Sequence, residues 1–504
     1  MEKTNNIFFD NLNNEASNYY FAKMYISIKY KNQKENFDYI FYNNIWFEYD
    51  NNNILKENKN KNPLKLSQNI TIILQDKLKN EYNKMIKIID PFDPNFKLYT
   101  NIYKTNYKNL GTTRYKESII SELQIYFEDI NLLEKLNHNN NIICFNDYIY
   151  DFELEEHRLI KKNDYITIFC DYKYPNNPDY NPNIKIEEEL NRFLYSLFEN
   201  QDTINFILDA LGFALFTNKF EKLFLLSGHG SNGKGVLMSL VSKAFDKYFS
   251  TPSNQFLTSK YDSSKPNECL YNSNNKKIVS ISEPENDSNG DILFNIEFIK
   301  KITGNDDITC RKMYGSNITF KPKFNIFVQC NEKPKLEKID NAVKRRFIAV
   351  DFPFTFKHGD NLKPNERPIN SELKDKFKNK NYYSGFMGIL IKHMKNKFNI
   401  NYLNIPLNIQ ESTTEYIDEN NVIGQFLDEE ILHTGDNKDY VNLTTLYKTF
   451  KISNDDNFIT QKKFKQGLLL NGLIEKKIKG IRAYYGRKII TIDESDGDSD
   501  SGSE

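Results

Sequence analysis

Hydrophobic and polar positions alternate with two different periodicities over the first part of the chain. In residues 1–62, short aromatic runs are separated by asparagine-rich turns. The apolar alternation on either side of Asn43 and Asn44 predicts a β-hairpin, because Asn tolerates the positive φ of tight hairpin turns. In residues 67–138 apolar residues recur three and four positions apart, which predicts helices.

Two further strand-like stretches and a linker follow. Residues 142–151 and 165–170 are rich in Ile, Phe and Tyr and predict strands. Pro175, Pro178 and Pro182 stand among Asn and Asp residues, which indicates a linker. We therefore expect an N-terminal α+β domain that ends near residue 185.

The pattern changes again after the linker. Residues 186–216 have amphipathic helical spacing, and residues 222–227 form a short run that is nearly all apolar, as in a buried parallel strand. Strand, loop and helix then alternate to about residue 354. Residues 361–404 are expected to be polar and helical, and residues 413–492 to hold short helices and a closing pair of strands. The pattern predicts an α/β protein overall.

Composition narrows the function classes. Lys plus Arg and Asp plus Glu number 68 each, so any contact with nucleic-acid phosphates must be concentrated in a local channel or loop. Neither an apolar run of membrane-spanning length nor a signal-peptide pattern is present, so we expect an intracellular, soluble protein without membrane contact.

Residues 493–504 form an acidic tail that is expected to be disordered. The five cysteines include no CxxC pair, which argues against zinc and disulfides and fits a reducing compartment (Cys144, Cys170, Cys269, Cys310, Cys330).

The strongest candidate site is a glycine-rich loop between the apolar strand and a helical run. Its nucleotide-binding candidates are Gly228, His229, Gly230, Ser231, Asn232, Gly233, Lys234, Gly235 and Val236. Glycines let such a loop point successive N–H groups at a phosphate, and Lys234 supplies a cation for the β- and γ-phosphates of ATP. A glycine-rich turn that merely contains Lys is the alternative, but the strand–loop–helix context favours a P-loop. Gly235 stands where the P-loop pattern has Ser or Thr, so one hydroxyl ligand of Mg²⁺ is missing.

Two later strands end in polar residues that suit the same site. A buried strand ends at Glu283, whose carboxylate could organise Mg²⁺ through water and activate the attacking water; Glu285 is the second choice. Another strand ends at Asn331, whose amide could orient water against the γ-phosphate. Taken singly, each is more often a turn residue. We expect Lys234, Glu283 and Asn331 to meet at one phosphate site.

Basic residues form two further candidates. Arg345 and Arg346 precede a strand, where an arginine of a ring ATPase reaches the γ-phosphate of a neighbouring subunit; an ordinary solvated basic face is the alternative. Turn residues 314–317 join two extended runs into an expected hairpin. The cations of that hairpin could grip a DNA backbone, although an exposed basic hairpin without function is equally consistent (Arg311, Lys312, Lys321, Lys323).

In this order the motifs resemble the superfamily III helicases, most closely the poxvirus-type primase–helicase family. The resemblance rests on the Asn-Gly-Lys loop, the Ser-Glu-Pro strand end, the block at residues 299–315, the block at residues 322–334 and the double arginine. It implies an AAA+-like P-loop core at residues 186–360. It also implies a helper domain at residues 1–185, a helical connector at 361–410 and a winged-helix-like DNA-binding domain at 411–492. Ser282 departs from relatives that carry an acid there.

The resemblance further implies a Mg²⁺-dependent ATPase that translocates on single-stranded or forked DNA as a homo-hexamer at a viral replication site in the host cytoplasm. No primase constellation is recognised, so a primase, like a polymerase, would be a separate partner. Two other readings stay open. A weak ATP- and DNA-binding scaffold or origin-binding protein would explain Gly235 and Ser282, whereas a P-loop kinase would leave the basic hairpin and the winged helix without a purpose.

Overall fold

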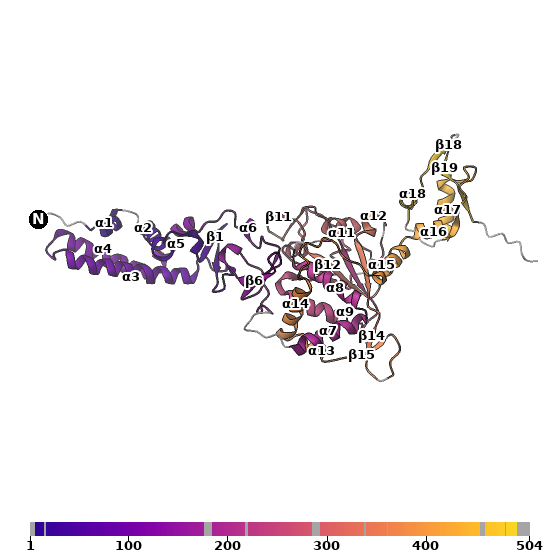
Figure 1. Ribbon diagram of the computed structural model, residues 1–504. Helices are drawn as coiled ribbons and strands as arrows, with labels where there is room; N and C mark the ends of the chain where they lie inside the picture. Colours follow the sequence, from indigo (N-terminus) through magenta and orange to yellow (C-terminus); the bar gives the residue numbers. More distant parts are fainter. Residues whose placement is uncertain are drawn as a thin grey trace, which may run out of the picture. The chain divides into compact units, whose positions relative to one another are not determined.

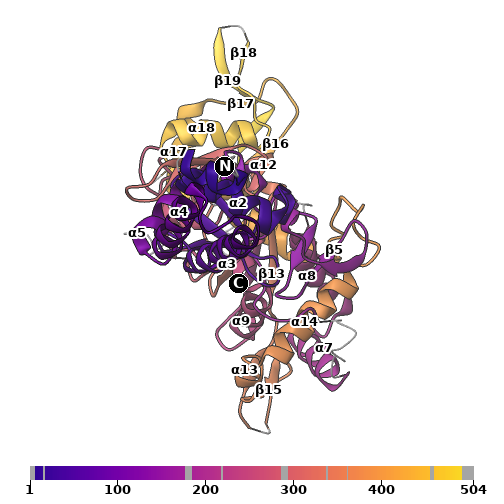
Figure 2. The ribbon, with the colours of Figure 1, turned by 90° about the vertical axis from the view of Figure 1, so that its left-hand side faces the viewer.

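The computed structural model describes residues 6–14, 17–175, 184–216, 220–284, 293–336, 339–359, 361–453, 459–478 and 480–490. The chain divides into two compact units, Met1–Tyr174 and Pro175–Glu504. Figure 1 shows the elements of both units, and Figure 2 shows them turned by 90°. Within the described ranges, every helix is too short or too polar to cross a membrane.

The first unit begins with helices, not with the strands predicted for its first residues. Helices α1 (Ile7–Asn14) and α2 (Ser17–Tyr30) precede the first strand. Phe9, Phe21 and Tyr25 are fully buried in one core with the later helices. Their aromatic side chains suggested strands, but the spacing from Phe21 to Tyr25 is also one helical turn, and burial against neighbouring helices selects the helix.

The predicted hairpin at Asn43 and Asn44 is confirmed. These two residues have φ values of 48° and 62°, and Tyr42 pairs with Ile45 across the turn. The hairpin belongs to an antiparallel sheet of β1 (Tyr39–Tyr42), β2 (Ile45–Tyr49) and β3 (Leu55–Asn58). The predicted helices follow as α3 (Leu64–Ile88), α4 (Pro94–Leu110), α5 (Thr113–Phe127) and the short α6 (Leu132–Lys135).

A second small sheet contains β4 (Ile142–Cys144), β5 (Tyr148–Asp151) and β6 (Glu156–Leu159). The strand predicted at residues 165–170 is wrong, because this segment joins the sheet only through a single bridge from Cys170 to Phe145. The side-chain oxygen of Asn137 accepts the backbone N–H groups of Thr167 at 2.9 Å and Ile168 at 3.1 Å. The Asn137 side chain thus accepts the backbone N–H groups that would otherwise pair with a neighbouring strand.

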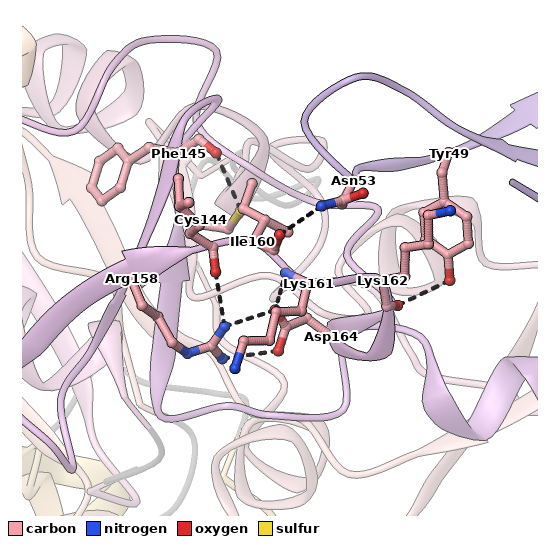
Figure 3. A network of polar contacts seen from close by, with 10 residues as sticks. Tyr49, Asn53, Cys144, Phe145, Arg158, Ile160, Lys161, Lys162 and Asp164 are labelled. Atoms are coloured by element: carbon pink, nitrogen blue, oxygen red, sulfur yellow. Dashed lines mark hydrogen bonds and ion pairs between the residues drawn. The ribbon is translucent and has the colours of Figure 1, made fainter. Parts of the chain in front are cut away.

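A network of polar contacts fixes the loop after β6 (Figure 3). Arg158 donates two hydrogen bonds of 2.8 Å to the carboxylate of Asp164, which also accepts the N–H of Lys161 at 2.7 Å. Asn53 donates to the carbonyl oxygen of Ile160 at 2.8 Å. The Asp164 contact raises the pKa of Arg158. Since Asn53 precedes β3, the network ties the two sheets of this unit together.

The second unit starts with two helices where the pattern predicted one. Helix α7 (Ile184–Phe198) ends before Glu199, which has φ 47°, and α8 (Gln201–Gly212) begins after Asn200. The side-chain oxygen of Asn200 accepts the N–H of Thr203 at 3.0 Å and caps the new helix.

A five-stranded parallel sheet forms the centre of this unit. Its strands are β7 (Leu223–Ser227), β8 (Phe249–Ser250), β9 (Ile278–Ser282), β12 (Asn325–Cys330) and β13 (Phe347–Asp351). Their order is β13-β7-β12-β9-β8, and all four pairings are parallel. The carboxyl ends of the strands therefore share one edge, where open α/β sheets bind their ligands.

Helices cover both faces of the sheet. On one face Leu225 and Val328 share a core with α11 (Ile296–Thr303) and with Tyr416 of α15 (Leu407–Glu419). On the other face Phe224 stacks on Phe327 and meets Phe206 of α8. Helices α8, α9 (Lys234–Phe245) and α14 (Lys380–His393) gather on that side (Figure 1).

Helix α14 corrects the expectation for residues 361–404. It contacts α7, α8 and α9, and its central residues Phe386, Met387 and Leu390 are fully buried. The segment is therefore not uniformly polar and helical. It also contains β15 (Glu366–Pro368), which pairs with β14 (Thr355–Lys357), and the short α13 (Leu373–Lys376). The sequence on both sides of α14 is polar, so the short apolar stretch at its centre did not stand out in the hydrophobic pattern.

Smaller elements complete the second unit. An antiparallel hairpin joins β10 (Ile308–Arg311) to β11 (Asn317–Phe320), and the short helices are α10 (Glu268–Asn272) and α12 (Asn341–Lys344). The last region contains α16 (Val422–Glu430), β16 (Ile431–His433), β17 (Tyr440–Val441), α17 (Leu443–Ser453), α18 (Gln461–Leu470), β18 (Lys476–Ile478), β19 (Ile481–Tyr485) and β20 (Arg487–Ile489). Phe426, Phe450 and Phe464 form its own core.

Candidate functional site

The glycine-rich loop connects the carboxyl end of β7 to the first turn of α9. Gly228 has φ 148° and Gly233 has φ 86°, conformations that L side chains rarely adopt. A Cβ atom on Gly228 would lie 2.3 Å from Nδ2 of Asn232 and 2.9 Å from the carbonyl oxygen of Phe352. The loop is thus closed tightly on itself in front of the N-terminus of α9, as a phosphate-binding loop requires.

Lys234 is the first residue of α9 and is 4% exposed. Its Nζ donates to the carbonyl oxygen of Gly228 and lies 3.4 Å from Oδ1 of Asn331. Burial lowers the pKa of Lys234, while Cys330 and Glu283 act in the opposite direction. The ammonium group is held inside the loop, where a phosphate oxygen could replace the Gly228 carbonyl as its partner.

Glu283 follows β9 at the same edge of the sheet. Its N–H donates to the carbonyl oxygen of Gln329 at 2.9 Å, and its backbone has φ 48°. A left-handed conformation at a non-glycine residue costs about 1–3 kcal/mol and is concentrated at functional sites. The Glu283 side chain is exposed, as is Ser282. Glu285 lies outside the described residues.

Three polar residues at this edge were missed in the sequence. The hydroxyl of Ser227 donates to the carboxylate of Asp351, and Nζ of Lys333 lies 3.1 Å from the same carboxylate oxygen. Asp351 is in register with Ser227 on the neighbouring strand. A signal was present, because Asp351 is the next-to-last residue of the strand predicted at residues 347–352. The order of the strands was needed to place it beside the loop.

The side chain of Asn232 tests whether the glycine-rich loop fits the phosphates of a nucleotide. Its Oδ1 accepts the N–H of Lys234 at 3.3 Å, whereas its Nδ2 is buried without a hydrogen-bond partner. A buried donor without a partner costs free energy unless a ligand supplies an acceptor. A phosphate oxygen inside the loop would supply one, so the residues present fit the group.

A cavity of about 340 Å³ opens beside the loop. Its lining combines Ser231, Asn232, Gly233, Gly235, Val236 and Ser239 with Lys374 and Phe377. Val236 and Ser239 lie along the first turns of α9, beyond the phosphate loop, so the cavity suits the nucleoside part of a nucleotide. Lys374 and Phe377 come from the segment predicted to be a connector, and no motif in the sequence indicated them.

Gly235 lies at the wall of this cavity, and a Cβ atom built on it has no heavy atom within 4 Å. Among the residues that the structure describes, no group of three His, Cys, Asp or Glu side chains could hold a metal ion. Mg²⁺ would therefore depend on phosphate oxygens, water and single carboxylates such as that of Glu283.

We expect Gly235→Ser to lower the Mg²⁺ concentration that half-saturates ATP hydrolysis on the order of tenfold, because it adds one oxygen ligand to a charged centre. Mg²⁺ titrations of the ATPase rate give the measurement. Gly235→Ala is the matched control, since it fills the same space without an oxygen. Equal Mg²⁺ requirements for the Ser variant and the parent would mean that the missing hydroxyl is irrelevant.

The two candidate arginines lie at the opposite edge of the sheet. The carbonyl oxygen of Arg346 accepts the N–H of Leu223 at the start of β7. Since a five-residue strand spans about 16 Å, Arg345 and Arg346 cannot reach the phosphate loop of their own chain. Their surroundings differ sharply. The Arg345 side chain is 62% exposed, and among the described residues its one ion pair is with Glu221 at 3.1 Å.

The Arg346 side chain is 7% exposed and is fully engaged. It donates to the hydroxyl of Thr303 at 3.1 Å and to the carbonyl oxygen of Ala342 at 3.1 Å, and it lies 3.3 Å from Glu221. The sequence left both arginines open as candidates. The geometry leaves only Arg345 free to contact another molecule.

The basic residues of the predicted hairpin lie on or beside β10 and β11. Arg311 donates to the carbonyl oxygen of Ser264 at 3.2 Å, and Nζ of Lys312 lies 4.6 Å from the ring centroid of Tyr271. Burial, followed by the charge of Lys321, lowers the pKa of Lys323. Tyr314 at the tip is 96% exposed.

Comparison with known proteins gives related sequences from large DNA viruses. A model of a family of unknown function (DUF5906) matches residues 226–346, which include the loop, Glu283, Asn331 and both arginines. The putative helicase L207/L206 of Acanthamoeba polyphaga mimivirus is 27% identical over 466 residues, which cover 87% of this chain and 45% of that protein. Primase D5 of fowlpox virus is 26% identical over 200 residues, 38% of this chain and 25% of that protein.

These findings agree with the resemblance: the chain is similar in sequence to proteins of large DNA viruses that are named putative helicase and primase D5. The chain spans less than half the length of these two relatives. Among solved structures, the apo C-terminal region of NrS-1 covers 89% of this chain and 95% of its own, at 12% identity and a TM-score of 0.42. A TM-score below 0.5 is too low to support a detailed structural argument.

Proposed function

We propose that the chain is an ATP-driven DNA helicase of the superfamily III type that acts in viral-type DNA replication. The observation that carries the proposal is the contact between Lys234, which the glycine loop holds, and Asn331 at the end of β12, with Glu283 at the same sheet edge. Backbone N–H groups and Lys234 would bind the phosphates, and Asn331 and Glu283 would orient and deprotonate the attacking water. Mg²⁺, when bound, would neutralise charge on the phosphates.

Assembly as a ring, of six subunits by resemblance, would place Arg345 against the ATP of a neighbour. The strand order β13-β7-β12-β9-β8 supports an AAA+-like core, and the exposure of Arg345 at the edge opposite its own loop supports action between subunits. In such a ring the β10–β11 hairpin would contact single-stranded DNA. Arg311, Lys312, Lys321 and Lys323 would bind phosphates, and Tyr314 could stack on a base.

A second candidate is an ATP- and DNA-binding replication scaffold with weak hydrolysis. Gly235 and Ser282 favour it, because Gly235 lacks the hydroxyl that the P-loop pattern directs at Mg²⁺, and Ser282 is a neutral residue where relatives carry a carboxylate. Under either candidate, a primase and a polymerase would be separate partners, and the work would take place at a viral replication site in the host cytoplasm.

Strand separation on forked DNA distinguishes the candidates. We expect the purified protein to unwind a labelled fork with ATP and Mg²⁺, and Lys234→Ala to lower the rate by about 10²- to 10³-fold, because a preorganised charge on the phosphates is lost. Lys243→Ala is the matched control, since it removes a lysine from the last turn of the same helix. ATP and DNA binding without unwinding in the parent protein would favour the scaffold.

A further inference from the structure

The outer side of the glycine-rich loop is covered by the chain that follows β13. The backbone N–H of Phe352 donates to the carbonyl oxygen of Ser227 at 2.8 Å. Further along, the N–H of Phe356 in β14 donates to the carbonyl oxygen of Ser231 at 2.7 Å. A Cβ atom on Gly233 would lie 3.4 Å from Cε2 of Phe356. The position of β14 therefore limits the conformations that the loop can adopt.

Arg367 holds β14 in this position through its neighbour β15. It is the direct partner of Phe356 in the pairing of the two strands. Its Nε and Nη2 donate to the two carboxylate oxygens of Glu199 at 2.5 and 2.7 Å. Its Nη1 donates to two carbonyl oxygens of the chain just before it, at 2.8 and 2.7 Å. The guanidinium carbon lies 3.8 Å from the ring centroid of Phe354. Such a two-pronged ion pair fixes orientation as well as distance.

The other partner of this ion pair is attached to the same loop. Glu199 directly follows α7, and its N–H donates to the carbonyl oxygen of Tyr195 at 2.7 Å. The side chain of Leu197, also in α7, occupies the space that a Cβ atom on Gly233 would need. Helix α7 and strand β14 thus meet the loop at one glycine, and the ion pair between Arg367 and Glu199 connects them.

The chain after β15 stays on α7 and reaches the cavity beside the loop. Phe377 lines that cavity, and its ring lies 4.9 Å from the ring of Phe193 in α7. Nζ of Lys376 lies 2.8 Å from the carboxylate of Glu189, also in α7. Figures 1 and 2 show α7, α13 and β15 at the same end of the second unit. One segment, with Arg367 at its middle, therefore borders both the loop and the cavity.

We infer that Arg367 is a positioning residue for ATP binding, which acts by holding β14 against the glycine-rich loop through Glu199. A loop that is already held in its binding conformation loses less entropy when the ligand binds, so affinity is higher. The contacts of Arg367 are to the protein, not to the reacting phosphate, so its loss should change affinity and not turnover. The inference rests on the proposed binding of ATP in this loop, but not on hydrolysis or on DNA.

The test compares Arg367→Gln, Glu199→Gln and the double variant in the full chain. Lys392→Gln is the matched control, because it breaks an ion pair of 2.8 Å between α14 and Glu187 near the start of α7, the opposite end from Glu199. Calorimetric titration with a non-hydrolysable ATP analogue and Mg²⁺ gives the affinity. Turnover at saturating ATP and thermal melts without nucleotide are measured on the same variants.

We expect Arg367→Gln to weaken the affinity on the order of tenfold, with turnover at saturating ATP unchanged. The double variant should bind no more weakly than Arg367→Gln alone, because both residues act through one contact. Arg367→Lys should lie between the parent and Arg367→Gln, since an ammonium group cannot bridge both carboxylate oxygens in the same way. The control should bind like the parent.

Unchanged affinity in Arg367→Gln overturns the inference, as does an equal loss in the control or a double variant whose losses multiply. A lower melting temperature with unchanged affinity would assign Arg367 to the fold alone and overturns it as well. If Arg367→Gln does not fold, Arg367→Lys decides by the same criteria. A parent protein that binds ATP without hydrolysing it, with affinity that depends on Arg367, refutes the helicase proposal and leaves this inference standing.

Discussion

Replacing Arg345 by alanine is expected to lower the rate of ATP hydrolysis by about 10³- to 10⁵-fold, the effect of losing an arginine that stabilises charge on the transferred phosphoryl group. Arg345 lies at the sheet edge opposite its own loop, and its exposed side chain pairs with Glu221. The loss should therefore arise between subunits. Thermal stability should hardly change, since an exposed ion pair contributes about 0–1 kcal/mol.

Mixing variants tests this placement directly. A subunit with Arg345→Ala retains its phosphate loop, and a subunit with Lys234→Ala retains its arginine. A mixed ring should then contain some complete sites, and activity should return on mixing two inactive proteins. Failure to recover activity, when both variants still assemble, would contradict the transfer of Arg345 to a neighbour.

Arg346→Ala is the matched control with a different expected outcome. Its buried side chain contacts Thr303, Ala342 and Glu221. Removing Arg346 leaves the buried Thr303 hydroxyl without this donor, and the loss of a partner at a buried polar group costs about 1–3 kcal/mol. We expect this variant to melt at a lower temperature, whereas Arg345→Ala melts with the parent. The reverse pattern would assign the functional role to Arg346.

The second large effect is expected at Glu283. Glu283→Gln should lower the hydrolysis rate by about 10²- to 10⁴-fold with ATP binding retained, because the amide cannot accept the proton of the attacking water. Single-turnover hydrolysis and nucleotide-binding titrations separate the two steps. A weakened affinity for ATP with unchanged turnover would mean that Glu283 serves binding and not catalysis.

The left-handed backbone at Glu283 allows a control variant that distinguishes a catalytic role of the side chain from a structural one. Glycine adopts φ 48° without the penalty of a side chain. Glu283→Gly should therefore raise the free energy of unfolding by about 1 kcal/mol while abolishing hydrolysis. A variant that is both more stable and inactive is expected only where the residue is retained for chemistry. Destabilisation by Gly would mean that the Glu283 side chain supports the fold.

The glycine-rich loop between a buried strand and a helix could be predicted from the sequence because its signal is local. A buried strand, the glycines and a helix start are contiguous between Leu223 and Phe245, and each element requires only its neighbours. The strand ends at Glu283 and Asn331 were recognised for the same reason. Their convergence depends on strand order, which follows from pairings between residues far apart in the sequence.

What could not be predicted depends on such distant contacts. Asp351 lies beside the loop only because β13 pairs with β7. Phe377 reaches the cavity from a segment whose polar composition resembles a connector. Arg345 and Arg346 cannot be distinguished in the sequence, because both are arginines before the same strand. They differ in burial, and the Arg346 side chain is buried where it contacts Thr303 and Glu221. The N-terminal helices were mistaken for strands because aromatic residues favour both states when they pack.

ATP hydrolysis by the purified protein, with and without single-stranded DNA, tests the central claim most directly. We predict Mg²⁺-dependent turnover that single-stranded DNA stimulates and that Lys234→Ala lowers by about 10²- to 10³-fold, since Lys234 stands at the centre of the proposed phosphate site. Absence of turnover in the parent protein, with binding of ATP and DNA intact, would contradict the motor and support a scaffold in which Gly235 and Ser282 reduce the number of protein ligands to Mg²⁺.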